Sequence, residues 1–129
     1  MTRLPLDVPI LVRRVAFHGP DGIQEIDALL DTGAVCTMIA WDVAKDIGYD
    51  PAVASRRTSI VTANGVVDVP VIAVAAVTLG DVCAENVEVV VHDIPEIADI
   101  QGLLGLSFLQ HCRTVIDYAA GSLEITQSR

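Results

Sequence analysis

Apolar and polar positions alternate along the first thirty residues and then close up into an unbroken apolar run. Residues 6–17 (LDVPILVRRVAF) and residues 23–30 (IQEIDALL) have the composition of β-strands, and residues 18–22 (HGPDG) between them have the composition of a turn. Pro9 indicates an edge position or a bend in the first strand. We therefore expect a hairpin over residues 6–30, whose second strand becomes buried on both faces where the alternation fades.

The middle of the chain predicts one short helix and a second hairpin. Residues 40–48 (AWDVAKDIG) fit a helix, because apolar residues recur four positions apart and a glycine follows the last turn. Residues 58–79 have strand composition on both sides of Asn64-Gly65, which is the strongest short hairpin signal in the chain.

The last third of the chain predicts further strands around a second helix. Residues 80–81 mark a turn, residues 82–91 alternate like a strand, and residues 92–101 have the composition of a loop. Residues 102–112 (GLLGLSFLQHC) suit a short helix, and residues 114–126 close the chain as a hairpin. The predicted fold class is all-β, mainly β with one or two short helices.

The composition indicates a single folded domain over residues 1–129. Hydrophobic residues make up 52% of the chain and charged residues only 19%, which disfavours a disordered chain. A net charge of −9 repels phosphate backbones, so we expect no nucleic-acid partner. The longest uncharged apolar stretch, residues 69–80, is too short to span a bilayer, and no signal segment opens the chain. We therefore expect a cytoplasmic location.

The three cysteines, Cys36, Cys83 and Cys112, are widely spaced and odd in number. They match neither a disulfide framework nor a zinc site, and we interpret them as small apolar residues in a reducing compartment. The histidines are scattered, so we expect neither a metal nor a cofactor. Cys36 lies near Asp31 in the sequence and is the nucleophile of an alternative thiol hydrolase, although no histidine lies near it.

Asp31 directly follows the apolar residues 28–30, where a carboxylate is costly unless it is paired, hydrogen-bonded or neutralised. The Asp-Thr-Gly at residues 31–33 is also compatible with a surface turn capped by the aspartate. Its context favours another interpretation. An apolar strand leads into it, an Asn-Gly hairpin follows, and a Leu-Leu-Gly element occurs far downstream at residues 103–105.

Together these motifs resemble those of the retropepsin-like aspartic proteases, which include retroviral proteases and their single-domain bacterial and cellular relatives. The resemblance extends over about residues 8–126. It rests on residues 28–34 (ALLDTGA), 62–71 (TANGVVDVPV), 102–109 (GLLGLSFL) and 115–125 (VIDYAAGSLEI). It implies a closed β-barrel of the acid-protease fold with one lobe per chain. The helix predicted after the first motif is more similar to the bacterial and ubiquitin-linked cellular members than to the viral ones.

The resemblance implies an aspartic endopeptidase that acts on a peptide or protein substrate. This chemistry needs two carboxylates that share one proton and one water, and aspartic proteases are the standard example of such a pair. The chain has one Asp-Thr-Gly, since Asp117-Tyr118-Ala119 does not repeat it. We therefore expect a symmetric homodimer, in which Asp31 lies beside Asp31 of the partner subunit.

The resemblance also assigns candidate site residues. Thr32 is expected to hydrogen-bond across to the partner loop, and the Gly33 amide to donate to a carboxylate. Ala34 stands where many two-domain relatives have a serine, which removes a donor to the carboxylate. The hairpin at Asn64-Gly65 takes the place of the flap, a mobile lid over bound peptide. The expected catalytic residues are Asp31, Thr32 and Gly33, and the expected substrate-binding residues are Ala34, Thr62, Ala63, Asn64, Gly65 and Val66.

A second class of function stays open, because fold does not determine function. The same fold also suits a non-catalytic dimeric module that binds peptides or assists assembly. The intact Asp-Thr-Gly at residues 31–33 favours the enzyme.

Overall fold

The computed structural model describes residues 2–6, 9–94 and 99–128. Within these ranges the chain is mostly β-strand, with two short α-helices and one 3₁₀ turn. In chain order the elements are β1 (Thr2–Pro5), β2 (Leu11–Gly19), β3 (Gly22–Leu30), β4 (Thr37–Ile39), α1 (Trp41–Asp46), η1 (Pro51–Val53), β5 (Arg56–Thr62), β6 (Gly65–Leu79), β7 (Val82–Val91), β8 (Gly102–Leu104), α2 (Leu106–Leu109), β9 (Cys112–Asp117) and β10 (Ser122–Gln127).

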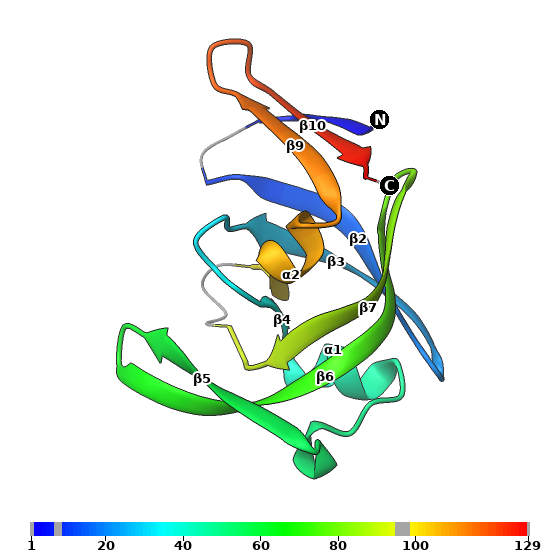
Figure 1. The fold of residues 1–129 in the computed structure, drawn as a ribbon, viewed down its shortest axis with the longest axis vertical. Coiled ribbons are helices and arrows are strands. Elements are labelled where there is room, and N and C mark those ends of the chain that lie inside the picture. The colour runs from blue at the N-terminus through cyan, green and yellow to red at the C-terminus, as the bar shows by residue number, and fades with distance from the viewer. Residues whose placement is uncertain (1, 7–8, 95–98, 129) are drawn as a thin grey trace.

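Six strands close into a barrel in the order β2-β3-β8-β4-β7-β6 (Figure 1). The seam between β2 and β6 pairs Ala16 with Thr78 and Phe17 with Val77. Hairpin neighbours are antiparallel, whereas β3–β8 and β4–β7 are parallel pairs of strands that are distant in the sequence. β5 pairs with the first half of β6 outside the barrel, so this hairpin extends away from the core.

A separate three-stranded sheet in the order β1-β10-β9 brings the two ends of the described chain together. The expectation of a mainly β fold with two short helices and a closed barrel is confirmed. No helix within the described residues is long and apolar enough to cross a membrane.

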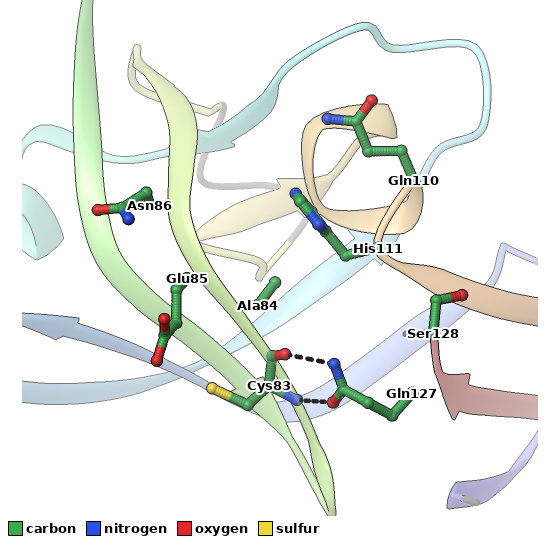
Figure 2. A pocket seen from close by; sticks show the side chains of 8 residues that line it. All are labelled: Cys83, Ala84, Glu85, Asn86, Gln110, His111, Gln127 and Ser128. Atoms are coloured by element: carbon green, nitrogen blue, oxygen red, sulfur yellow. Dashed lines mark hydrogen bonds between the residues drawn. The ribbon is translucent and has the colours of Figure 1, made fainter.

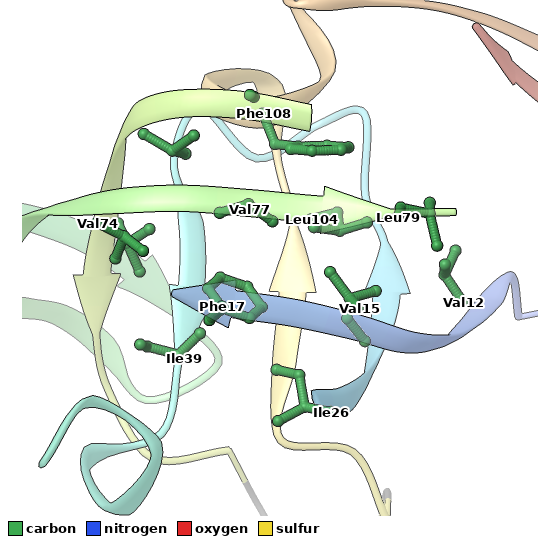
Figure 3. Close-up of a cluster of buried hydrophobic side chains, with 14 of the residues drawn as sticks. Val12, Val15, Phe17, Ile26, Ile39, Val74, Val77, Leu79, Leu104 and Phe108 are labelled. Carbon is green, nitrogen blue, oxygen red and sulfur yellow. The ribbon is translucent and has the colours of Figure 1, made fainter. Parts of the chain in front are cut away.

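The barrel interior is filled by β-branched and aromatic side chains (Figure 3). Phe17, Phe108, Ile39 and Leu104 are fully buried and come from β2, α2, β4 and β8. Fully burying such a side chain stabilises the fold by about 1.5–3 kcal/mol. Leu104 is the inner residue of β8, so the strand that runs beside β3 is anchored in the core.

A second, smaller apolar cluster lies under the β5–β6 hairpin. Its buried members are Val69, Val71 and Val90, and partly buried Met38 and Ile60 pack against it. This cluster attaches the extended hairpin to β4 and β7.

The local signals in the sequence located most elements correctly. The predicted helix at residues 40–48 is α1, and Gly48 follows it with φ +103°, a conformation that favours glycine. The β5–β6 hairpin predicted at Asn64-Gly65 is present, but its two turn residues are Ala63 and Asn64, and Gly65 already begins β6 opposite Thr62. Residues 80–81 form the β6–β7 turn as predicted. The hairpin predicted over residues 114–126 is β9–β10.

The helix predicted over residues 102–112 is wrong over most of its length. Residues 102–104 are β8, only residues 106–109 are helical, and β9 begins at Cys112. β8 pairs with both β3 and β4, and these tertiary hydrogen bonds outweigh the helical propensity of a short apolar run.

The first strand also differs from the prediction. The structure divides the N-terminal region into β1 and a β2 that begins at Leu11 and continues to Gly19, so the strand does not run unbroken over residues 6–17. Residues 7–8 of that predicted strand, and residues 95–98 of the predicted loop, lie outside the described residues.

Candidate active site

Asp31 is the first residue after β3, on the loop that leads to β4. β3 runs between β2 and β8, so its end is held from both sides. The Asp31 backbone N–H donates to the Leu104 carbonyl at 2.9 Å, and the Leu30 N–H donates to the Ile10 carbonyl at 2.9 Å. Asp31 is therefore attached to a strand end that hydrogen bonds hold in place, and the residue is half-buried.

Backbone groups of the Asp31 loop fold back onto the aspartate. The Gly33 N–H donates to Asp31 Oδ1 at 2.9 Å, which confirms the predicted contact. The Ala34 N–H donates to the Asp31 carbonyl at 3.3 Å. A Cβ at Gly33 would lie 3.3 Å from Oδ1, so the glycine allows this close approach.

The segment after β8 binds the loop through its backbone. The Leu106 N–H donates to the Ala34 carbonyl at 2.8 Å, and the Ser107 N–H donates to the Val35 carbonyl at 2.9 Å. The start of α2 therefore presents its free N–H groups to the loop that carries Asp31. The segment that supports the loop therefore begins in the Leu-Leu-Gly element at residues 103–105 and extends to Ser107.

Gly105 lies against the same loop and leaves no room for a side chain. A Cβ at this position would lie 2.6 Å from the Cys36 carbonyl oxygen and 2.8 Å from that of Ala34. The Gly105 N–H donates to Oγ1 of Thr37 at 3.1 Å, and Thr37 is fully buried. The fit of backbone against backbone fixes the course of residues 31–37.

A cavity of about 560 Å³ opens beside Asp31, between the Asp31 loop and β5. Its walls are mainly apolar, and Asp31 is the one carboxylate among the described residues that line it. The lining residues are Asp31, Gly33, Ala34, Val35, Cys36, Met38, Thr58, Ser59, Ile60, Val61, Thr62, Val90 and Leu103. Such a cavity suits an apolar side chain of an extended peptide next to a single carboxylate.

The structure brings some of the expected site residues together and not others. Ala34 and Thr62 line the cavity with Asp31 and Gly33. The expected residues Ala63 and Asn64 line a neighbouring cavity of about 580 Å³, which shares Met38 and Thr62 with the first. Gly65, Val66 and Thr32 are exposed in the single chain and belong to the lining of neither cavity.

Several lining residues were missed by the sequence analysis. Met38 and Val90 come from β4 and β7, and residues 58–61 come from β5. Residues 58–61 could have been predicted, because the Asn-Gly signal indicates a hairpin and so places a strand directly before it. Val90 could not have been predicted, since its position at the cavity depends on the pairing of β7 with β4.

The turn between β5 and β6 is closed by its own side chain. Oγ1 of Thr62 accepts a hydrogen bond from the Asn64 N–H at 3.2 Å and donates to the Gly65 carbonyl at 3.0 Å. Gly65 has φ +111°, as a tight hairpin requires. Val61 is 84% exposed and Val66 is 71% exposed, so the tip carries uncovered apolar side chains.

Cys36 lines the cavity, but its surroundings disfavour a reactive thiolate. Burial raises the pKa of the Cys36 thiol, the negative charge of Glu88 raises it further, and Arg56 only partly opposes this. The alternative thiol hydrolase therefore has little support. Among the described residues no group of three or more side chains is arranged to hold a metal ion.

Another pocket, of about 620 Å³, lies beside β7, α2 and β10 (Figure 2). Here the Gln127 side chain pairs with the backbone of Cys83, accepting from its N–H at 2.6 Å and donating to its carbonyl at 2.7 Å. The lining of this pocket contains one carboxylate, Glu85, and none of the residues around Asp31.

Known proteins are similar to this chain in sequence and in fold. Residues 14–108 match the family model described as aspartyl protease. The chain belongs to this aspartyl protease family. A retropepsin-like aspartic protease from Rickettsia conorii, known from a crystal structure, superposes with a TM-score of 0.69 at 22% sequence identity, over 95% of each chain. This member of the aspartyl protease family therefore has a retropepsin-like fold.

A curated relative shows how much of a longer protein such a domain can represent. The chain is 30% identical over 86 residues to an uncharacterized protein in the cobV 5′ region of Sinorhizobium sp.. The match covers 67% of the present chain and only 36% of that relative.

Proposed function

We propose that this family member is an aspartic endopeptidase that works as a symmetric homodimer. The observation that carries the proposal is the position of Asp31. Its carboxylate lies at a rigid strand end, accepts a loop amide and faces a cavity in which it is the one carboxylate among the described lining residues. A dyad therefore requires Asp31 of the partner subunit.

In this mechanism a water molecule lies between the two Asp31 carboxylates, one of which is protonated. The ionised carboxylate takes a proton from the water while the water oxygen bonds to the scissile carbonyl carbon. The protonated carboxylate gives its proton to the carbonyl oxygen. When the C–N bond breaks, the leaving nitrogen takes the proton that the dyad holds. One hydroxyl of the tetrahedral intermediate returns its proton to the dyad as the new carboxyl group forms, so one shared proton remains.

The residues around Asp31 have separate roles in the proposal. The Gly33 amide helps to hold the carboxylate in place, and exposed Thr32 is free to bind the partner loop. The β5–β6 hairpin acts as the flap, since its strand β5 forms one wall of the cavity and its tip is exposed. Closing such a lid excludes water and holds the peptide.

A peptide library incubated with wild type and with Asp31→Asn tests the proposal. We expect cleavage by the wild type and its loss in the variant, because an amide cannot carry the shared proton. Asp46→Asn, the same change at the exposed end of α1, is the matched control and should cleave like the wild type. Peptide binding without cleavage by the wild type would favour the non-catalytic module instead.

A further inference from the structure

The hydroxyl of Ser107 bonds to two neighbouring strands of the barrel, β4 and β7. It accepts a hydrogen bond from the Thr37 backbone N–H at 2.9 Å and donates one to the Glu88 carbonyl at 2.7 Å. Thr37 begins β4 and Glu88 lies on β7, so one side chain links both to the start of α2. The single donor of the hydroxyl is thereby used within the protein.

Ser107 also reaches the Asp31 loop through its backbone. Its N–H donates to the Val35 carbonyl at 2.9 Å. The loop is therefore bound by Ser107 at Val35 and again at Thr37, four and six residues after Asp31. The Gly33 amide that donates to Asp31 Oδ1 belongs to the same short loop, so its direction depends on how these two points are held.

Removing the hydroxyl would leave both of its partners without this contact, and the contact with Thr37 is part-buried. The N–H of Thr37 would lose its acceptor, and the carbonyl of Glu88 would lose a donor. An unsatisfied N–H in a part-buried position costs free energy. We therefore expect the Asp31 loop to shift until the Thr37 N–H reaches water. A displacement of about 1 Å at a reacting group lowers rates by roughly a hundredfold.

We propose that Ser107 is a positioning residue for the Asp31 carboxylate. The inference rests on the proposed function, because it assigns Ser107 a part in that reaction. Ser107 is not among the residues that line the cavity, so it acts through the loop and not through the substrate. Neither the sequence analysis nor the motif around Asp31 singled it out.

The test compares Ser107→Ala with Ser107→Thr, which keeps a hydroxyl, in the full-length chain. With a peptide that the wild type cleaves, we expect the alanine variant to lose about tenfold or more in kcat. KM should stay within about twofold, since no cavity wall has changed. The threonine variant should recover most of the rate. Ser55→Ala, at an exposed bend before β5, is the control for loss of a serine hydroxyl.

Amide hydrogen exchange over residues 31–37 provides a readout that does not depend on proteolysis. We expect faster exchange there in Ser107→Ala and wild-type exchange in Ser107→Thr, with both variants folded by circular dichroism. Should the alanine variant fail to fold, Ser107→Cys keeps the size of the side chain with a much weaker hydrogen bond and takes its place.

The outcomes separate the two proposals. A wild type that cleaves no peptide removes the proposed function, and the exchange rates alone then decide whether Ser107 holds the loop. An active wild type with unchanged kcat in the alanine variant overturns the role of Ser107. Equal losses in the alanine and threonine variants, or a rise in KM without a fall in kcat, overturn it as well.

Discussion

The carboxylate of Asp31 accepts a hydrogen bond from the Gly33 amide and faces a mainly apolar cavity. Among the described residues that line this cavity, none is a lysine or an arginine. Under the proposed function, such a carboxylate depends on hydrogen bonds to its charged form and on a shared proton. Small changes in the donors near Asp31 should therefore move the pH range of the proposed activity.

Ala34→Ser places a hydroxyl donor on the loop beside Asp31. The donor stabilises the ionised carboxylate, so the shared proton leaves at lower pH. We expect the alkaline limb of the pH–rate profile to move down by about one pH unit or less, as one modest hydrogen bond allows. The same substitution at exposed Ala52 is the control. An alkaline limb that moves upward would contradict the argument.

Gly105→Ala would place a methyl group against the backbone of the Asp31 loop, 2.6 Å from the Cys36 carbonyl oxygen. Because backbone atoms cannot give way as a flexible side chain can, we expect a loss of about 1–3 kcal/mol in the free energy of unfolding. Urea unfolding at fixed protein concentration measures it. An unfolding free energy within about 0.5 kcal/mol of wild type would show that the loop yields easily.

The three thiols should differ in reactivity because they differ in burial. Burial raises the pKa of Cys112 to about 11, and it raises that of Cys36 as well. At pH 8 only about one Cys112 thiol in a thousand is a thiolate, whereas Cys83 is exposed. Peptide mapping after alkylation with iodoacetamide should show Cys83 labelled first and Cys112 labelled faster as the pH rises toward 11. Preferential labelling of Cys36 would revive the thiol hydrolase.

At the scale of elements, the hairpins were predictable because their signals are local. Gly65 and Gly80 both have positive φ; Gly80 lies in its two-residue turn, and Gly65 directly follows the turn formed by Ala63 and Asn64. The Asp31 site was predicted from a motif at the end of a strand, taken together with the motifs downstream of it. These features need no knowledge of distant pairing, which is why the sequence was enough.

The elements that the sequence did not predict depend on partners far along the chain. β1 pairs with β10, so that Leu4 lies opposite Leu123 and no nearby residue indicates the strand. β8 is three residues long and becomes a strand only because β3 and β4 lie beside it. The same holds for Val90 and Ser107, whose contributions to the site come from the packing of β7 and α2.

The β5–β6 hairpin is the element whose motion the proposed function requires. Thr62→Val removes the hydroxyl that closes its turn, while Thr62→Ser keeps that hydroxyl. We expect KM to rise about fivefold in the valine variant, as the loss of one hydrogen bond predicts, and to stay near wild type in the serine variant. Steady-state kinetics on one peptide measures both. An identical KM in all three proteins would argue against a flap.

Across the molecule, three segments with exposed apolar or aromatic side chains lie on one side. In Figure 1 the β5–β6 turn, the loop between β3 and β4, and the β9–β10 turn lie along the same side of the barrel. Val66 next to the first turn, Val35 in the loop and Tyr118 in the last turn are 71%, 73% and 67% exposed. Apolar exposure near Asp31 supports the proposed dimer.

Mixed dimers of wild type and Asp31→Asn test whether one site draws on both chains. After equal amounts are mixed and allowed to exchange subunits, about one quarter of the dimers are purely wild type, so activity should fall to about a quarter of that of an equal total amount of wild type. If each chain carried an independent site, the mixture would keep half of the activity of an equal total amount of wild type. Sedimentation should show a dimer, and a strict monomer that still cleaves peptides would contradict the shared dyad.

The pairing of β3 with β8 has a consequence for the timing of synthesis. Asp31 is made early, but the residues that shape its loop, from Leu104 to Ser107, are made more than seventy positions later. Since translation proceeds from the N-terminus at about 5–20 residues per second, Asp31 is synthesised seconds before the segment that holds its loop in place. A nascent chain that ends before Ser107 contains Asp31 but lacks the hydrogen bonds from Ser107 that hold the Asp31 loop in place. The order of residues thus delays the geometry of the Asp31 site until the residues up to Ser107 have been synthesised.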